Sequence, residues 1–238
     1  MLANLPYSLS QSGALDRDVQ VPSTFKDELI GFVADQLPLW RDRNERIAET
    51  SETALTSQLC AHLNSVARHS DGWDVLQFRV EEQDEIKGGR KVDLVAAPCG
   101  VALIIEGRRH VDFDSILPIE CKRLPTPVGK ERDEREYVFS KYKSTGGVQR
   151  FKAGHHGAAH NRGAMIGYIQ EDTRSNWFNR MTGWINELDS KEPGWTAKDL
   201  LQHDRSDDTL RVTFCRSLHE RAGGLPPIEL RHLWLEMN

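Results

Sequence analysis

Two apolar stretches carry the charged residues on which the interpretation of this chain depends: Arg-Lys-Val-Asp-Leu-Val-Ala-Ala at 90–97 and Ile-Leu-Pro-Ile-Glu-Cys-Lys-Arg-Leu at 116–124. Both have the apolar content of strands in a protein core. Because side chains alternate along a strand, Glu120 and Lys122 are predicted to share one face. If the two strands are neighbours, Asp93 and Glu120 can share a hard divalent cation, with Lys122 beside it. The alternative is a simple salt bridge between Glu120 and Lys122.

The size and composition of the chain predict an ordinary globular protein. With 238 residues it can bury a core without disulfides, and we expect one unit, residues 49–238, on which an arm and a helix at residues 1–48 pack. No apolar run approaches membrane-spanning length and no signal peptide is visible, which predicts a cytoplasmic protein without a membrane partner. The net charge of -5 means that a polyanionic partner must contact a local basic patch.

The cysteines show no pattern of disulfides or of zinc ligands. They lie far apart, without a Cys-x-x-Cys pair and without zinc-ligand spacing to histidine. We therefore expect reduced thiols in the core at Cys60, Cys99, Cys121 and Cys215.

Hydrophobic periodicity places helices and strands along the chain. Residues 1–23 are predicted to be irregular, and a first helical segment is predicted from Thr24 to about Ile47, which Pro38 should kink or end. The remaining predicted elements are a helix from Thr50 or Ser51 to Arg68, strands at 73–82, around Asp93, at 101–105 and at 115–124, a turn at 87–90, a solvated charged segment at 128–136, a helix opening at Thr145, a strand at 163–170, a helix over 177–188, and closing strands at 210–218 and 228–237.

Glu52 occupies an unusual position in the second predicted helix. It lies three residues before Leu55 and seven before Leu59, so it projects from the buried face at the N-terminal end. One interpretation is that a carboxylate in the first turn complements the helix dipole, in a region that Glu49 also makes acidic. The other is that Glu52 is a third acid of a metal site. The sequence leaves both open.

Residues 137–170 contain no Asp or Glu, although the chain is acidic overall. Five Lys or Arg side chains and three histidines make this segment electropositive, which favours phosphate binding; a merely solvated basic surface is the alternative. The helix that opens near Thr145 adds backbone amides that favour phosphate. The residues predicted to contact nucleic acid are Lys141, Lys143, Gln149, Arg150, Lys152, His155 and His156.

The order of these elements resembles the core of the PD-(D/E)XK nuclease superfamily, the restriction-endonuclease-like fold. A helix with Glu52 is followed by a strand, a strand with Asp93, a strand with Glu120-x-Lys122, a helix and a strand, over about residues 49–170. The resemblance implies an α/β fold: an α-β-β-β-α-β core with a central mixed sheet flanked by helices, extended by N-terminal helical and C-terminal β elaborations. The roles that it implies are metal-binding acids at Asp93, Glu120 and Glu52, a catalytic lysine at Lys122, and a helix-borne polar residue at Gln149 or Arg150.

The resemblance also implies a function. It predicts a phosphodiester hydrolase that uses Mg²⁺ or Mn²⁺, bound by Asp93, Glu120, Glu52 and the carbonyl oxygen of Cys121. We expect a DNA endonuclease of a bacterial restriction or antiphage system, acting on double-stranded DNA as a homodimer or with a partner subunit. The alternatives are an RNA-directed nuclease and a non-catalytic nucleic-acid-binding or assembly subunit of the same fold.

Two features depart from the family pattern. Between Asp93 and Glu120 lie 26 residues, more than a tight hairpin needs, so the interval must contain an extra strand or loop. Val92 stands where the motif has proline, a position at which the superfamily is tolerant. The interval also contains rival acids that could replace Asp93 in the metal site, namely Glu106, Asp112 and Asp114.

Overall fold

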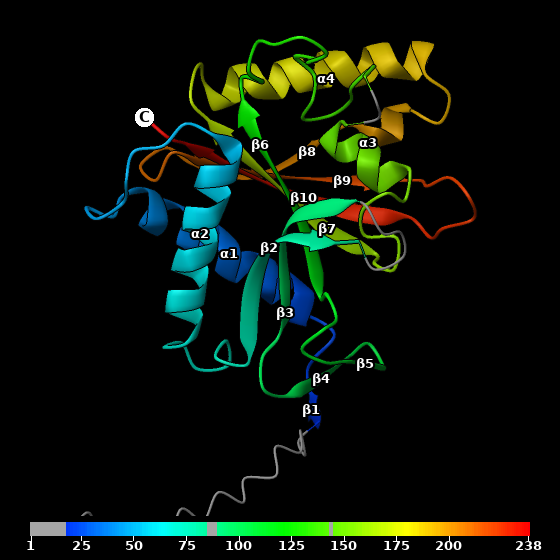
Figure 1. The fold of residues 1–238 in the computed structure, drawn as a ribbon. Helices are drawn as coiled ribbons and strands as arrows, with labels where there is room; N and C mark the ends of the chain where they lie inside the picture. The colour runs from blue at the N-terminus through cyan, green and yellow to red at the C-terminus, as the bar shows by residue number, and fades with distance from the viewer. Residues whose placement is uncertain (1–17, 85–89, 143–144) are drawn as a thin grey trace, which may run out of the picture.

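The computed structural model describes residues 18–84, 90–142 and 145–238 of the chain. Its central feature is a seven-stranded mixed sheet made of β2 (Leu76–Gln83), β3 (Lys91–Pro98), β6 (Leu117–Leu124), β7 (Arg162–Ile169), β8 (Gln202–Asp207), β9 (Val212–His219) and β10 (Ile228–Glu236). The strand order is β2-β3-β6-β7-β10-β9-β8 (Figure 1). The pairs β6–β7 and β7–β10 are parallel, and the other pairs are antiparallel. The predicted α/β class and mixed sheet flanked by helices are confirmed.

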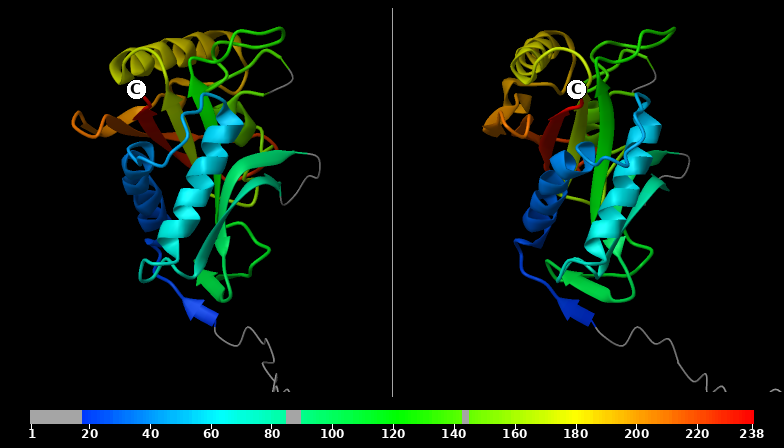
Figure 2. Two further views of the ribbon diagram at one scale, coloured as in Figure 1. Left: turned by 60° about the vertical axis from the view of Figure 1, so that its left-hand side comes forward. Right: turned by 90° about the vertical axis from the view of Figure 1, so that its left-hand side faces the viewer.

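Helices cover both faces of the sheet. They are α1 (Phe25–Arg41), α2 (Glu52–Ala67), α3 (Gly147–Lys152) and α4 (Arg174–Lys191). The apolar sides of α1 and α2 form one core with Leu94, Ile119 and Leu233, and α3 and α4 form a second core with Met165 and Trp234. Figure 2 shows α1 and α2 beside one another and α4 apart from both. Within the described ranges, no helix is long and apolar enough to span a lipid bilayer.

A second, smaller sheet accommodates the long interval between β3 and β6. Its strands are β1 (Asp18–Gln20), β4 (Ala102–Ile105) and β5 (Arg108–His110). β1 is parallel to β4, and β5 is antiparallel to it. The predicted extra strand is therefore present, whereas the prediction of an irregular lead-in is wrong for residues 18–20. Residues 1–17 and most of the predicted turn at 87–90 lie outside the described residues.

The first helix does not end at its proline. α1 continues through Pro38 and ends at Arg41, short of the predicted boundary near Ile47. Proline removes one helical hydrogen bond because it has no amide donor. Burial of Leu37 and Trp40 on either side of it offsets this cost, since each contributes large apolar area to the core.

Several polar segments differ from the sequence predictions. β8 was missed because its residues are polar, and all six are exposed along the edge of the sheet. The segment 128–136 forms a loop, but Asp133 and Glu136 within it are buried and not solvated. Cys99 is exposed, whereas the other three cysteines are buried thiols as predicted.

Candidate active site

The predicted acids meet where β3 separates from β6. The two strands pair only as far as Ile119 of β6. Beyond that point, the amides of β6 donate hydrogen bonds to carboxylate side chains in place of the carbonyl oxygens of a neighbouring strand. Oδ2 of Asp93 accepts the amide of Cys121 at 2.8 Å, and Oε2 of Glu52 accepts the amide of Arg123 at 3.2 Å. Two acids from distant parts of the chain are thus fixed along the open edge of β6, since buried backbone donors require partners.

The start of α2 holds Glu52 at this edge. Ser51 caps the helix, with its Oγ accepting an amide of the first turn at 3.2 Å. The carbonyl oxygen of Thr50 accepts bonds from Nη1 of Arg123 at 2.5 Å and from Nε2 of Gln170 at 2.8 Å. These contacts tie the helix start to the ends of β6 and β7. Glu52 lies with the other acids, and it is also the acidic residue in the first turn of α2, so the structure is compatible with both roles left open by the sequence.

Lys122 lies at the centre of the acids. Its Nζ atom is 3.1 Å from Oε1 of Glu52, 3.5 Å from Oδ2 of Asp93, 2.9 Å from Oε1 of Glu120 and 2.9 Å from the carbonyl oxygen of Cys121. Burial alone would lower the pKa of Lys122, but these carboxylates hold it well above its ordinary value. These surroundings favour the ammonium form of Lys122, which donates hydrogen bonds to the acids around it.

Glu120 is fully enclosed by positive and donor groups. Besides Lys122, Nη1 of Arg150 lies 2.5 Å from its Oε1, and Nδ1 of His156 lies 3.0 Å from its Oε2. Burial by itself would raise the pKa of Glu120, but Lys122, His156 and Arg150 together lower it. Arg150 and His156 were predicted to contact nucleic acid. The structure places both against Glu120, with His156 buried.

The cluster carries an excess of negative charge. Glu52, Asp93 and Glu120 are opposed by the full charges of Lys122 and Arg150. Burial and the charge of Glu120 raise the pKa of Asp93 to about 6, because Lys122 compensates only in part. Mg²⁺ and Mn²⁺ prefer hard carboxylate oxygens whose negative charge is not fully balanced by neighbouring positive groups.

The residues present therefore fit such an ion by chemistry, although the side chains are arranged around a lysine. In the parts of the chain that the structure describes, no three His, Cys, Asp or Glu side chains form a group that could hold a metal ion. The physical reason lies in Lys122, whose ammonium stands between the acids. The structure therefore contains donor atoms suited to such an ion, but they are not arranged as a metal site.

Glu136 is a nearby acid that the sequence analysis missed. It is buried, and burial raises its pKa. The charge of Glu52 also raises this pKa, whereas the charge of Lys122 lowers it. Its carboxylate pairs with Arg132 at 3.0 Å. Its carbonyl oxygen accepts the amide of Gly147 at the start of α3 at 2.8 Å. No signal marked it, since it lies in a run of charged residues that looks solvated.

The rival acids of the long interval are held elsewhere. Glu106 pairs with Lys26 at 2.8 Å. Asp112 accepts the amide of Gly100 at 2.9 Å, and Asp114 accepts an amide of its own turn at 2.8 Å. These residues belong to the loops around the small sheet, so Asp93 is the acid that joins Glu120.

Most residues predicted to contact nucleic acid have other roles. Lys152 is buried and pairs with Asp199 at 2.5 Å, so its assignment to a phosphate-binding surface is wrong. Oε1 of Gln149 accepts the amides of Gly146, at the start of α3, and of Ser140 in the preceding loop. The first amides of α3 bond to the carbonyl oxygens of residues 136–138, so they are not available to phosphate. Lys141 is exposed, His155 is half-buried, and Lys143 lies outside the described residues.

Lys152 belongs instead to a buried polar chain behind α3. The chain runs from Lys152 to Asp199, His219, Ser217, His232, Tyr137 and Trp234, with successive distances of 2.5, 2.6, 2.6, 2.7, 2.9 and 2.8 Å. Burial lowers the pKa of His219 and lowers that of His232 to about 3, so both rings are neutral. With neutral rings every donor in the chain has an acceptor.

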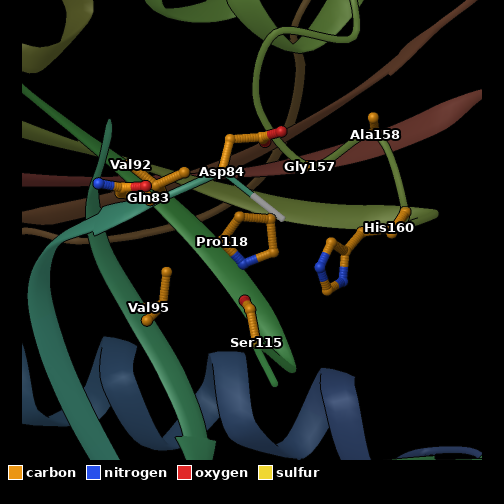
Figure 3. A pocket seen from close by; sticks show the side chains of 10 residues that line it. Gln83, Asp84, Val92, Val95, Ser115, Pro118, Gly157, Ala158 and His160 are labelled. Carbon is orange, nitrogen blue, oxygen red and sulfur yellow. The ribbon is translucent and has the colours of Figure 1, made fainter. Parts of the chain in front are cut away.

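A small hollow beside β3 and β6 is separate from the acids. Figure 3 shows the side chains of Asp84, Pro118 and His160 around it. Among the described residues, its lining includes neither Glu120 nor Lys122. The hollow therefore does not form part of the cluster.

Comparisons of the chain with protein-family models, with curated proteins and with solved structures found no match. Any functional conclusion must therefore come from the residues and their geometry. The arrangement is specific enough to support one: acids from α2, β3 and β6 surround one ammonium, and α3 with the loop after it adds an arginine and a histidine.

Proposed function

We propose that this protein is a metal-dependent nuclease that hydrolyses phosphodiester bonds, with double-stranded DNA as its substrate. The observation that carries the proposal is the position of Lys122, whose Nζ atom lies within 3.5 Å of Glu52, Asp93 and Glu120. These acids come from three separate elements, and chance surface salt bridges do not gather in this way. A buried cluster with unbalanced charge is typical of functional sites.

The order of elements supports the restriction-endonuclease-like core as a proposal for the fold family. The sequence runs α2, β2, β3, β6, α3 and β7, with the small sheet inserted between β3 and β6. β6 and β7 are parallel, and α3 lies on the connection between them. This is the α-β-β-β-α-β order of that fold, with Asp93 and the Glu120-x-Lys122 motif on its adjacent strands. The restriction or antiphage setting rests on the family resemblance alone.

The residues that would hold Mg²⁺ or Mn²⁺ are Asp93, Glu120, Glu52 and the carbonyl oxygen of Cys121. When bound, such an ion polarises the phosphate and lowers the pKa of a water molecule. In the overall reaction, the oxygen of a water bonds to phosphorus, the ester P–O bond breaks, and a proton of the water passes to the released alkoxide.

The protein's own residues have defined tasks in this reaction. Lys122 stays charged in its surroundings, so it can donate hydrogen bonds to the attacking water or to phosphate oxygens that gain negative charge. Asp93 and Glu52 have side chains that are 26% and 29% exposed, so they face the side from which a substrate arrives. Glu120 is buried, and its contact with the ammonium orients Lys122 from the interior of the protein.

A non-catalytic binding subunit remains the second candidate, because one observation favours it. Glu120 is already paired with Lys122 and Arg150, and it could serve only to stabilise the fold. The pairing of Lys152 with Asp199 and of Arg162 with Asp27 reduces the basic surface on which nucleic acid would lie, so within this candidate it favours an assembly subunit over a nucleic-acid-binding one.

Cleavage assays separate the two candidates. Purified protein is incubated with supercoiled plasmid, single-stranded DNA and RNA, each with Mg²⁺ or Mn²⁺. We expect plasmid cutting that EDTA abolishes and that Glu120→Ala abolishes. Nucleic-acid binding without cutting under either metal would falsify the nuclease proposal, and cutting of RNA alone would change the substrate class. Asp208→Ala is the control, since the side chain of Asp208 is 96% exposed at the surface.

A further inference from the structure

Glu120 can bind a metal ion only if one of its present partners moves. Its side chain is 0% exposed, and both carboxylate oxygens are in contact with neighbours. Lys122 and Arg150 lie 2.9 and 2.5 Å from Oε1, and Nδ1 of His156 lies 3.0 Å from Oε2. Oε1 already contacts both positive groups, so a metal ion that binds at Oε1 would have to replace one of them.

Arg150 is the partner best placed to move. Its side chain is 24% exposed, compared with 9% for Lys122 and 2% for His156. Lys122 is also held by Glu52 and by the carbonyl oxygen of Cys121. In the described part of the chain, Glu120 is the one acid with which Arg150 forms an ion pair. A long side chain with one partner and an open side can leave without disturbing the core.

The backbone that carries Arg150 is fixed, so the motion would be confined to the side chain. The amide of Arg150 bonds to the carbonyl oxygen of Gly146 at 2.9 Å. Two residues later, Lys152 is anchored by its buried ion pair with Asp199. The start of α3 is tied to the neighbouring loop through the amide of Gly147 and the carbonyl oxygen of Glu136.

We propose that Arg150 is a displaceable cation that couples metal loading to phosphate binding. Before the metal binds, its guanidinium neutralises Glu120. When a metal ion takes its place at Oε1, the guanidinium turns to the open side, where it can bind a phosphate oxygen of the substrate. This inference rests on the proposed function, and it gives Arg150 two opposite effects: it opposes metal binding and favours substrate binding.

The opposite effects provide the test. Mn²⁺ alone is titrated by calorimetry into wild-type protein, Arg150→Gln and Arg132→Gln. Arg132 is the matched control because its guanidinium pairs with Glu136, next to the cluster, and not with Glu120. A hydrogen bond between charged groups must be broken before the metal binds, so we expect Arg150→Gln to bind Mn²⁺ at least about tenfold more tightly than wild type. Arg132→Gln should change much less.

The outcomes distinguish this inference from the proposed function. Mn²⁺ binding by wild type with no increase in Arg150→Gln overturns the inference and leaves the metal site standing. An equal increase in Arg132→Gln overturns it as well, because the effect would then be one of general charge. Absence of Mn²⁺ binding in all three proteins overturns the metal site and the inference together.

A second measurement uses the wild-type protein and does not depend on a variant that folds. Phenylglyoxal modifies accessible guanidinium groups, and peptide mass spectrometry reports the rate at each arginine. We expect Mn²⁺ to increase the rate of modification at Arg150 and to leave that at Arg132 unchanged. An Arg150 rate that does not respond to saturating Mn²⁺ overturns the displacement.

Discussion

Two groups of charged residues lie on either side of α3, and they differ in how completely their charges and hydrogen bonds are satisfied. In the buried polar chain, Lys152 faces one carboxylate, Asp199, and each later donor has an acceptor up to Trp234. Around Lys122, three carboxylates surround one ammonium, and the pKa of Asp93 is raised to about 6. The first group is closed and balanced, and the second is part-exposed and carries excess negative charge.

The balance of charge decides which of the two groups can take a ligand. A balanced buried network gains nothing from an added ion or molecule, and it serves to fix the strands and α3 relative to one another. A cluster with excess negative charge is stabilised when a cation binds, so its uncompensated charge indicates a cation-binding site. The same lysine–carboxylate chemistry therefore stabilises the fold in one place and prepares a site in the other.

Breaking the balanced chain should have the largest effect. Asp199→Ala leaves the ammonium of Lys152 buried without its carboxylate, and we expect a loss of about 3–5 kcal/mol in the free energy of unfolding. Urea denaturation followed by circular dichroism measures it. The double variant Lys152→Met with Asp199→Ala should recover part of the loss, because it removes the unpaired charge. A loss below about 1 kcal/mol, the value of an exposed pair, would show that Lys152 reaches solvent in solution.

Breaking the unbalanced cluster should affect chemistry more than stability. In Lys122→Ala we expect the cleavage rate to fall by about 10²–10³-fold, the usual effect of removing a donor that stabilises developing charge. Mn²⁺ should bind at least as tightly as in wild type, because the ammonium is not a metal ligand and its removal takes a competing positive charge from Oε1 of Glu120. Plasmid cleavage and calorimetry measure the two quantities, with Lys191→Ala on α4 as control, since the side chain of Lys191 is 68% exposed. Loss of Mn²⁺ binding in Lys122→Ala would count against the assigned role.

The neutral histidines of the buried polar chain should make stability depend on pH, with a smaller effect. The pKa of buried His232 is about 3, below its ordinary value of 6.5. Between these two pH values the unfolded chain is protonated at His232 and the folded protein is not. The contribution of neutral His232 to the free energy of unfolding is therefore complete above pH 6.5. Below that pH it falls by up to about 1.4 kcal/mol per pH unit.

Urea denaturation of wild type and His232→Gln at pH 7 and pH 5 isolates this contribution. From pH 7 to pH 5 we expect the wild type to lose about 2 kcal/mol more than the variant. The comparison is between pH dependences, so a lower stability of the variant at both pH values does not affect it. Equal pH dependence in the two proteins would mean that His232 is protonated or solvated in the folded state.

Much of the fold and part of the site follow from sequence patterns. Period-2 alternation predicted that Glu120 and Lys122 share a face of β6, and the spacing of Leu55 and Leu59 predicted that Glu52 lies beside the core. These predictions succeed because the direction of a side chain within one element depends on local backbone geometry. Whether a charged segment forms a charged surface, in contrast, does not depend on local backbone geometry. Residues 137–170 looked like a basic surface, but their partners come from far along the chain.

The amino-acid sequence specifies which residues carry charge, which faces of helices and strands are apolar, and the order in which Glu52, Asp93, Glu120 and Lys122 appear. Which charges are paired depends on the tertiary fold. It opened the edge of β6 to Asp93 and Glu52, turned Arg150 and His156 onto Glu120, and buried Lys152 against Asp199. The physical reason is that ion pairs and burial depend on distances between segments that local patterns do not encode, whereas alternation and helical spacing are properties of a single segment.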